Sequence, residues 1–194
     1  MKKVLGIATL FLLLAFNVKD SINNPTTVTI APESRLMISG TTNINTFNCN
    51  FDTNGLQKPI PVHYEKMGSK YIFKEATLVL NNLGFDCGSN GINRDFHALL
   101  KSKEYPELLL KLRTLEGDLI DDKQLMATVD ITIAGNTNTY KIPVMKAQEE
   151  PGRITGDLTL GLSDFKLKAP KKALGLIVVH DAITISFDLE WELG

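Results

Sequence analysis

Apolar and polar residues alternate strictly along the last stretch of the chain, AITISFDLEWELG, residues 182–194. Every second side chain from Ile183 to Leu193 is apolar, whereas those between, from Thr184 to Glu192, are polar or acidic. Successive side chains of a β-strand point to opposite faces, so this pattern predicts a strand with one apolar and one solvated face. We expect this strand to pair back to an early strand, which would remove the open edges of a sheet.

The same two-residue period recurs through most of the chain, in segments that are separated by short polar turns. Together these segments predict about eight or nine strands, and short turns make neighbouring strands antiparallel. The sequence DTNG at Asp52–Gly55 predicts a tight hairpin, because Asn and Gly both accept a positive φ. Pro59 and Pro61 confine the following strand to an edge or an irregular start.

One segment breaks this period, GINRDFHALLKSKEYPEL at residues 91–108. Its apolar residues lie at positions i, i+4, i+7 and i+8, which predicts one short amphipathic helix: Ile92, Phe96, Leu99 and Leu100. Many short strands with a single helix favour a closed barrel or a sandwich. A barrel of about eight strands is either filled by side chains or holds one small ligand.

Residues 1–20, MKKVLGIATLFLLLAFNVKD, have the features of an export signal. Lys2 and Lys3 precede an apolar stretch from Val4 to Val18, and about 15 apolar residues are short for a membrane span. No A-x-A triplet marks a cleavage site, and no cysteine directly follows the apolar stretch. We expect a cleaved signal peptide, with an uncleaved N-terminal anchor as the alternative. In both cases the body of the protein is exported, to the periplasm or as a secreted protein.

In an exported protein, the two cysteines, Cys49 and Cys87, can be interpreted in two ways. An even pair in an oxidising compartment can form a disulfide. Two separate buried thiols that pack as small apolar side chains are the alternative.

Composition and charge exclude several classes of function. The net charge of −1 offers no basic surface for nucleic acid. His180 and Asp181 are adjacent but lack further ligands at metal-site spacing, and Asn50–Gly55 only begins like a calcium loop. No convergent set of acid, base and nucleophile is present, so we expect no catalytic residue, no metal and no cofactor.

Three short motifs occur in an order that is informative. They are EYP at Glu104–Pro106, ITIAG at Ile131–Gly135 and SDF at Ser163–Phe165. With the strand before the helix and the last strand, they make residues 28–193 resemble the YceI-like family of exported proteins. The resemblance implies an antiparallel, lipocalin-like β-barrel with an elongated apolar tunnel. It further implies a polyisoprenoid or another long-chain lipid as ligand, no catalysis, and it allows a homodimer.

The residues are compatible with such a ligand, because the inward candidates carry no charge. They are Leu78, Leu80, Leu110, Leu112, Val129, Ile131, Ile133, Leu158, Leu160, Phe187 and Leu189. Stripes of this kind also mark filled cores, and a structural or interaction module with a filled barrel is therefore the alternative function. Lys166 and Lys168 are candidates for contact with an anionic lipid headgroup, or with a membrane surface during transient contact; a solvated loop is the other interpretation.

Overall fold

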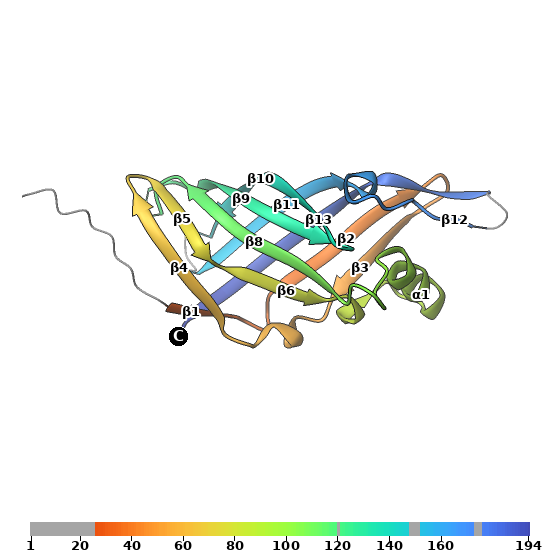
Figure 1. The fold of residues 1–194 in the computed structure, drawn as a ribbon, viewed down its shortest axis with the longest axis horizontal. Coiled ribbons are helices and arrows are strands. Elements are labelled where there is room, and N and C mark those ends of the chain that lie inside the picture. Colours follow the sequence, from red (N-terminus) through yellow and green to blue (C-terminus); the bar gives the residue numbers. More distant parts are fainter. Residues whose placement is uncertain (1–25, 120, 148–151, 173–175) are drawn as a thin grey trace, which may run out of the picture.

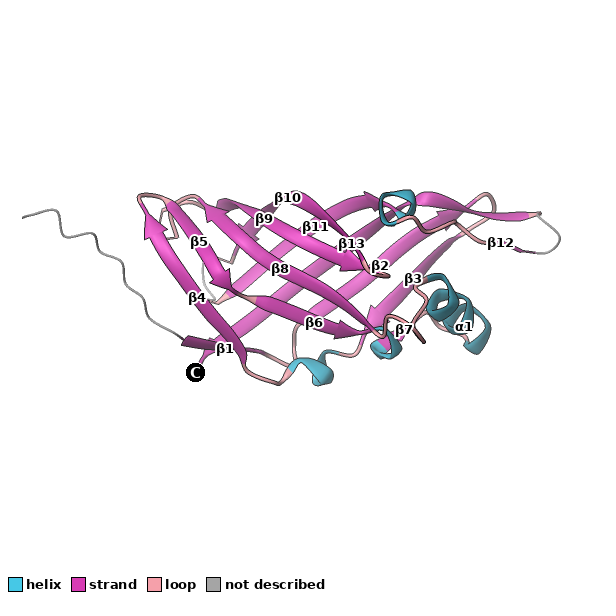
Figure 2. Ribbon diagram, viewed as in Figure 1, coloured by secondary structure: helices cyan, strands magenta, loops and turns pink. Residues whose placement is uncertain are grey.

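The computed structural model describes residues 26–119, 121–147, 152–172 and 176–194. The predicted signal peptide at residues 1–20 lies outside this part of the chain. Figure 2 shows that strands make up most of the described chain. No helix among the described residues is long and apolar enough to cross a membrane.

Eight antiparallel strands form a closed ring, because the first and the last of them pair with each other (Figure 1). In ring order they are β1 (Thr26–Ile30), β4 (Ile60–Met67), β5 (Lys70–Glu75), β8 (Glu107–Glu116), β9 (Gln124–Ile133), β10 (Asn136–Lys146), β11 (Arg153–Gly161) and β13 (Ile177–Leu193). This ring confirms the predicted antiparallel, lipocalin-like barrel. It also confirms that the last strand pairs with early ones, since β13 pairs with β1 and with β2.

Further strands extend the sheet at the end of the ring where α1 lies (Figure 1). They are β2 (Arg35–Thr42), β3 (Thr46–Phe51) and β7 (Phe85–Asp86) beside β13, β6 (Thr77–Asn81) beside β8, and β12 (Lys171–Lys172) on the tip of β13. Strand β8 therefore changes partner along its length. It pairs with β6 over Glu107–Lys111 and with β5 over Thr114–Glu116.

The helix α1 (Asn90–Leu99) confirms the predicted amphipathic segment. The Ser89 hydroxyl caps its N-terminus by accepting a hydrogen bond from the Ile92 amide at 3.3 Å. Phe96 and Leu100 are buried against the barrel, and the Phe96 ring centroid lies 5.4 Å from that of Phe85 on β7. The apolar face of the helix thus joins the core from Phe96 onward, whereas Ile92 in the first turn is 42% exposed.

A disulfide joins this end of the sheet, between Cys49 on β3 and Cys87 directly after β7. Their Cα atoms are 3.9 Å apart, and both side chains are buried. The bond closes a loop with a sequence separation of 38 residues, which includes β4, β5 and β6.

The hairpin prediction for Asp52–Gly55 is wrong. Thr53–Leu56 forms a short 3₁₀-helix, η1, and the Asp52 carboxylate caps it by accepting a hydrogen bond from the Asn54 amide at 3.1 Å. Strand β3 before it pairs with β2 and β7, whereas β4 after it pairs with β1 and β5. The aspartate cap turns the chain without a positive φ at Asn54 or Gly55.

A tight hairpin does occur between β9 and β10, at Ala134 and Gly135. Both residues have a positive φ, of 47° and 75°, as the two-residue turns of twisted hairpins require. A side chain at Gly135 would collide with Tyr105, because a Cβ there would lie 2.7 Å from the tyrosine ring. The hairpin tip is therefore packed under Tyr105.

Candidate functional site

The largest apolar hollow, the main cavity, has a volume of about 500 Å³ and lies inside the ring at the end formed by β1 and the β4–β5 hairpin. Among the residues that line it are Val28, Ile30, Ile60, Val62, Tyr64, Tyr71, Phe73, Ala76, Leu78, Leu110, Leu112, Leu115, Leu125, Ala127, Val144, Ile154, Leu189 and Trp191. They come from every strand of the ring, because each strand contributes its inward face, and from the start of β6.

The open space of the main cavity explains why some of its lining residues are only partly buried. Leu78 on β6 and Leu110 and Leu112 on β8 face inward but are only partly buried. Their counterparts closer to α1 on the same strands, Leu80 and Leu108, are 2% and 5% exposed. These three residues therefore lack close neighbours across the barrel, whereas other residues that line the main cavity, such as Leu125 and Val144, are 2% and 3% exposed.

An aromatic cluster forms part of the wall of the main cavity. The ring centroids of Tyr64 and Tyr71 are 5.8 Å apart, and those of Tyr64 and Phe73 are 5.7 Å apart. Trp191 on β13 also lines the cavity, and it is the one tryptophan of the chain. Sequence analysis missed the three β4–β5 aromatics as lining residues, although the alternation of Tyr71 and Phe73 was a usable signal.

Two basic residues of the main cavity's lining, Lys146 and Arg153, have partners in the protein. The Arg153 guanidinium donates two hydrogen bonds to the Asp188 carboxylate, at 2.7 and 2.8 Å. These bonds lower the pKa of Asp188 below its ordinary value, against the opposing effect of burial. The Lys146 ammonium donates to the Leu119 carbonyl. Asp188 alternates with the inward residues Phe187 and Leu189, so the Arg153–Asp188 pair lies on the outer face of the sheet, and Lys146 is the basic group that faces the rim.

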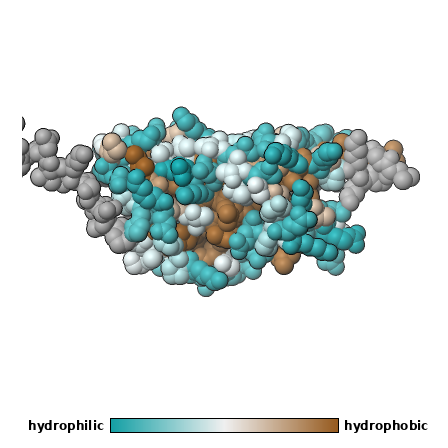
Figure 3. Space-filling model, in the orientation of Figure 1, coloured by the Kyte–Doolittle hydropathy of each residue, from teal (hydrophilic) through white to brown (hydrophobic). Residues whose placement is uncertain are grey.

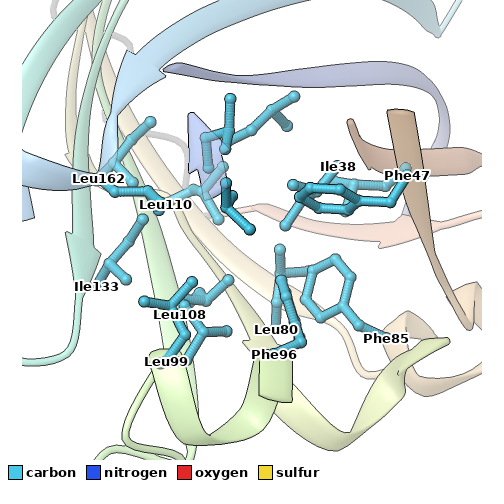
Figure 4. A pocket seen from close by; sticks show the side chains of 16 residues that line it. Ile38, Phe47, Leu80, Phe85, Phe96, Leu99, Leu108, Leu110, Ile133 and Leu162 are labelled. Carbon is cyan, nitrogen blue, oxygen red and sulfur yellow. The ribbon is translucent and has the colours of Figure 1, made fainter. Parts of the chain in front are cut away.

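A second hollow, the small cavity, lies deeper in the barrel and has a volume of about 40 Å³. Figure 4 shows its side chains converging from the sheet and from α1, with Phe47, Phe85 and Phe96 along one side. Among the residues that line it are Leu36, Ile38, Leu80, Leu99, Leu108, Leu110, Ile131, Ile133, Leu162, Ile183 and Ile185. Its lining is wholly apolar, and most of these side chains are buried.

A third hollow, the helix cleft, opens between α1 and the tips of β2, β3 and β13 and has a volume of about 250 Å³. Phe47, Phe96, Leu99 and Val179 line both this cleft and the small cavity. Apolar side chains also reach the surface over β6 in Figure 3, where Val79 is 43% exposed.

The eleven predicted lining residues divide among these regions. Leu78, Leu112 and Leu189 line the main cavity, Leu80, Ile131 and Ile133 line the small cavity, and Leu110 lines both. Val129, Leu158 and Leu160 belong to the buried core, and Phe187 packs against that core from β13. Their part in ligand binding stays a prediction.

Lys166 and Lys168 lie after η3 (Leu162–Phe165), which follows the last residue of β11. The rim residue Arg153 is the first residue of the same strand, eight steps of roughly 3.3 Å away. Both lysines are exposed, and they lie at the α1 end of the barrel rather than at the mouth of the main cavity. Their contact with a headgroup stays a prediction.

The adjacent residues His180 and Asp181 have structural partners. His180 Nδ1 lies 2.8 Å from the Thr41 hydroxyl, and the Asp181 carboxylate accepts hydrogen bonds from the amide and the hydroxyl of Ser163. Among the described residues, no group of three or more His, Cys, Asp or Glu side chains could hold a metal ion.

A ring of antiparallel strands around an apolar cavity defines a small, lipocalin-like all-β protein. The YceI-like domain model matches residues 74–191, more than half of the chain, and the chain therefore belongs to the YceI-like domain family. The family match begins in β5, and the structure adds β1 and β4, which complete the ring.

Solved structures share this fold. BcnA of Burkholderia cenocepacia is 19% identical, with a TM-score of 0.59 over 80% of this chain and 94% of that chain. A polyisoprenoid binding domain from Saccharophagus degradans, implicated in plant cell wall breakdown, is 15% identical, with a TM-score of 0.57 over 87% and 99%. The YCEI protein of Campylobacter jejuni is 18% identical, with a TM-score of 0.50 over 74% and 84%. No curated protein matches this chain.

Proposed function

We propose that this protein is an exported binding protein that holds a long-chain apolar ligand, a polyisoprenoid or another lipid, in its main cavity without catalysis. The observation that carries the proposal is the main cavity itself, about 500 Å³ of apolar space inside the ring. Ligand pockets of proteins commonly enclose about 300–1,000 Å³. A structural module would have no need of such space, since filling it with side chains would stabilise the fold.

The chemistry of the lining supports an apolar chain as the ligand. Aliphatic and aromatic side chains make the walls, and each methylene buried against them contributes about 0.8 kcal/mol. The likeness to a domain described as polyisoprenoid-binding supports the same class of ligand. The Lys146 ammonium at the rim favours a ligand whose polar end is neutral or anionic and stays near the opening.

Export to the periplasm or beyond is a second part of the proposal. Lys2 and Lys3 followed by an apolar stretch support a signal peptide, and a disulfide between Cys49 and Cys87 suits an oxidising compartment. Expression of the full-length chain, followed by cell fractionation and intact-mass measurement, tests this part. A full-length mass in the cytoplasmic fraction would contradict it.

Thermal unfolding with and without added prenols tests the binding function. A ligand at one hundred times its Kd stabilises the folded state by about 2.7 kcal/mol. We therefore expect farnesol or geranylgeraniol to raise the Tm by several degrees, and native mass spectrometry of the purified protein to detect bound lipid.

Two tryptophan variants locate the effect. Leu112→Trp fills the main cavity from β8 and should abolish the rise in Tm. Val79→Trp adds the same side chain on the outer face of β6 and should leave the rise unchanged. An unchanged Tm of the wild-type protein with every prenol, together with absence of co-purifying lipid, would contradict the proposal and favour a filled structural module.

A further inference from the structure

The main cavity ends inside the barrel, and the inward residues of β8 show where it ends. On the inward face of β8, Leu112 lines the main cavity, Leu110 lines both cavities and Leu108 lines the small cavity. These residues are two positions apart, so their side chains follow one another along the barrel. Leu110 is therefore the wall that the two cavities share.

The neighbouring strand β9 also has a filled position between the two cavities. On β9, Val129 lies between Ala127, which lines the main cavity, and Ile131, which lines the small one. Val129 pairs with Leu112, and Ile131 pairs with Leu110, so the filled position on β9 lies one inward residue closer to the main cavity than Leu110. The boundary between the two cavities therefore runs obliquely across the two strands.

Strand β13 repeats this arrangement with a larger side chain. Phe187 lies between Leu189, which lines the main cavity, and Ile185, which lines the small one. Its ring lies over Gly156 of β11, where an added Cβ would be only 2.6 Å from the ring. The absence of a side chain at Gly156 thus allows the Phe187 ring to extend across the sheet between the two cavities.

We propose that Leu110, Val129 and Phe187 form the floor of the binding site and set the length of the apolar chain that it accepts. This inference rests on the proposed function and assigns a specificity-determining role to three residues within it. A chain enters at the rim and extends until it reaches the floor. The small cavity beyond the floor is space that a longer chain could use only if the floor were opened.

The floor predicts a particular dependence of affinity on chain length. Each methylene that fits above the floor strengthens binding about fourfold, since about 0.8 kcal/mol corresponds to that change in Kd. Methylenes that reach the floor stay in water or displace packed side chains, so they add nothing. The Kd should therefore decrease as the prenol becomes longer and stay constant beyond one limiting length.

Titration of the purified protein with geraniol, farnesol, geranylgeraniol and longer prenols measures that length. Fluorescence of Trp191, the one tryptophan, reports on occupancy because this side chain lines the main cavity. Leu110→Ala joins the two cavities, so the Kd should keep falling to a longer prenol, by about tenfold relative to the wild type. Leu110→Phe raises the floor, so the limit should move to a shorter prenol.

Leu112→Ala is the matched control, because it truncates the same residue type two positions along the same strand but widens only the main cavity. It should change all Kd values by a similar factor and leave the limiting length unchanged. The same limiting length in wild type, Leu110→Ala and Leu110→Phe would overturn the floor while leaving the binding function intact. A wild-type protein that binds no prenol of any length would overturn the binding function and the floor together.

Discussion

The two halves of the barrel are built from the same kind of strand but differ in what they enclose. In the half around α1, here the packed half, inward residues such as Leu80, Leu108 and Ile131 are at most 5% exposed. In the half around β1 and the β4–β5 hairpin, the hollow half, Leu78 and Leu112 face about 500 Å³ of open space. The packed half also contains the helix and the disulfide. The difference suggests that one half holds the fold and leaves the other free to hold a ligand.

Removal of the disulfide should have the largest effect. In the chain-entropy model, a loop with a separation of 38 residues corresponds to about 4 kcal/mol of stability at 25 °C. We expect the double variant Cys49→Ala, Cys87→Ala to lose about that much free energy of unfolding in urea titrations. Since the bond lies in the packed half, the Kd for farnesol should change less than twofold at a temperature where the variant is folded. A large change in Kd with little change in stability would reverse the assignment of the two halves.

Truncation of one aliphatic residue in each half compares them directly. Ile131→Ala in the packed half leaves a void among close neighbours and should cost about 3 kcal/mol. Leu112→Ala in the hollow half only enlarges an existing space, and we expect a loss of about 1 kcal/mol. Chemical denaturation of both variants without ligand gives the two values. Equal losses would mean that the main cavity is filled in solution.

The ion pair between Arg153 and Asp188, on the outer face of the hollow half, should contribute less. Arg153 lowers the pKa of Asp188 in the folded protein, so the pair contributes stability above the ordinary aspartate pKa of about 4. That contribution is lost as the pH falls through the lowered pKa. We expect Asp188→Asn to lose about 1 kcal/mol at pH 7 and to flatten the acid limb of stability against pH. An acid limb identical to that of the wild type would show that the pair is not formed in solution.

The smallest expected effect concerns Tyr140 of β10, whose ring stacks on Phe165 of η3 in the packed half. Burial and a hydrogen bond to Asp164 raise the pKa of Tyr140 to about 12. The folded state therefore keeps this proton above the ordinary tyrosine pKa of about 10, whereas the unfolded chain loses it. Stability should fall between these two values, and Tyr140→Phe should remove that dependence. Absorbance titration of tyrosine ionisation checks this prediction. The variant should show one tyrosine fewer that ionises above the ordinary pKa.

The strands and the ring could be predicted because a pleated strand imposes a period of two on its sequence. The emptiness of one half could not be predicted in this way. Leu108, Leu110 and Leu112 are identical residues on one face of β8, yet they lie beside different amounts of space. What distinguishes them is the space in front of each side chain, and a period of two in the sequence carries no information about that space.

The motifs predicted the family but did not mark the cavity. Tyr105 packs on the hairpin glycine Gly135, and the Ser163–Phe165 segment forms η3, so both motifs serve the packed half. The aromatic wall of Tyr64 and Phe73 belongs to no motif, and it was missed. The hairpin error at Asp52–Gly55 has a local cause, since a side-chain cap at Asp52 turns the chain in place of the Asn-Gly pair.

Strand β13 (Ile177–Leu193) runs through both halves, and along its 17 residues it pairs with β2 and then with β1 on one side. Opening of the hollow half therefore need not break the hydrogen bonds that hold the same strand in the packed half. Amide hydrogen exchange along β13 should follow this geometry. Amides near Ile183 and Ile185 should exchange only through global unfolding, whereas those near Trp191 should exchange through local opening of the β1–β13 pair. One continuous strand thereby gives the barrel a rigid end and a breathing end.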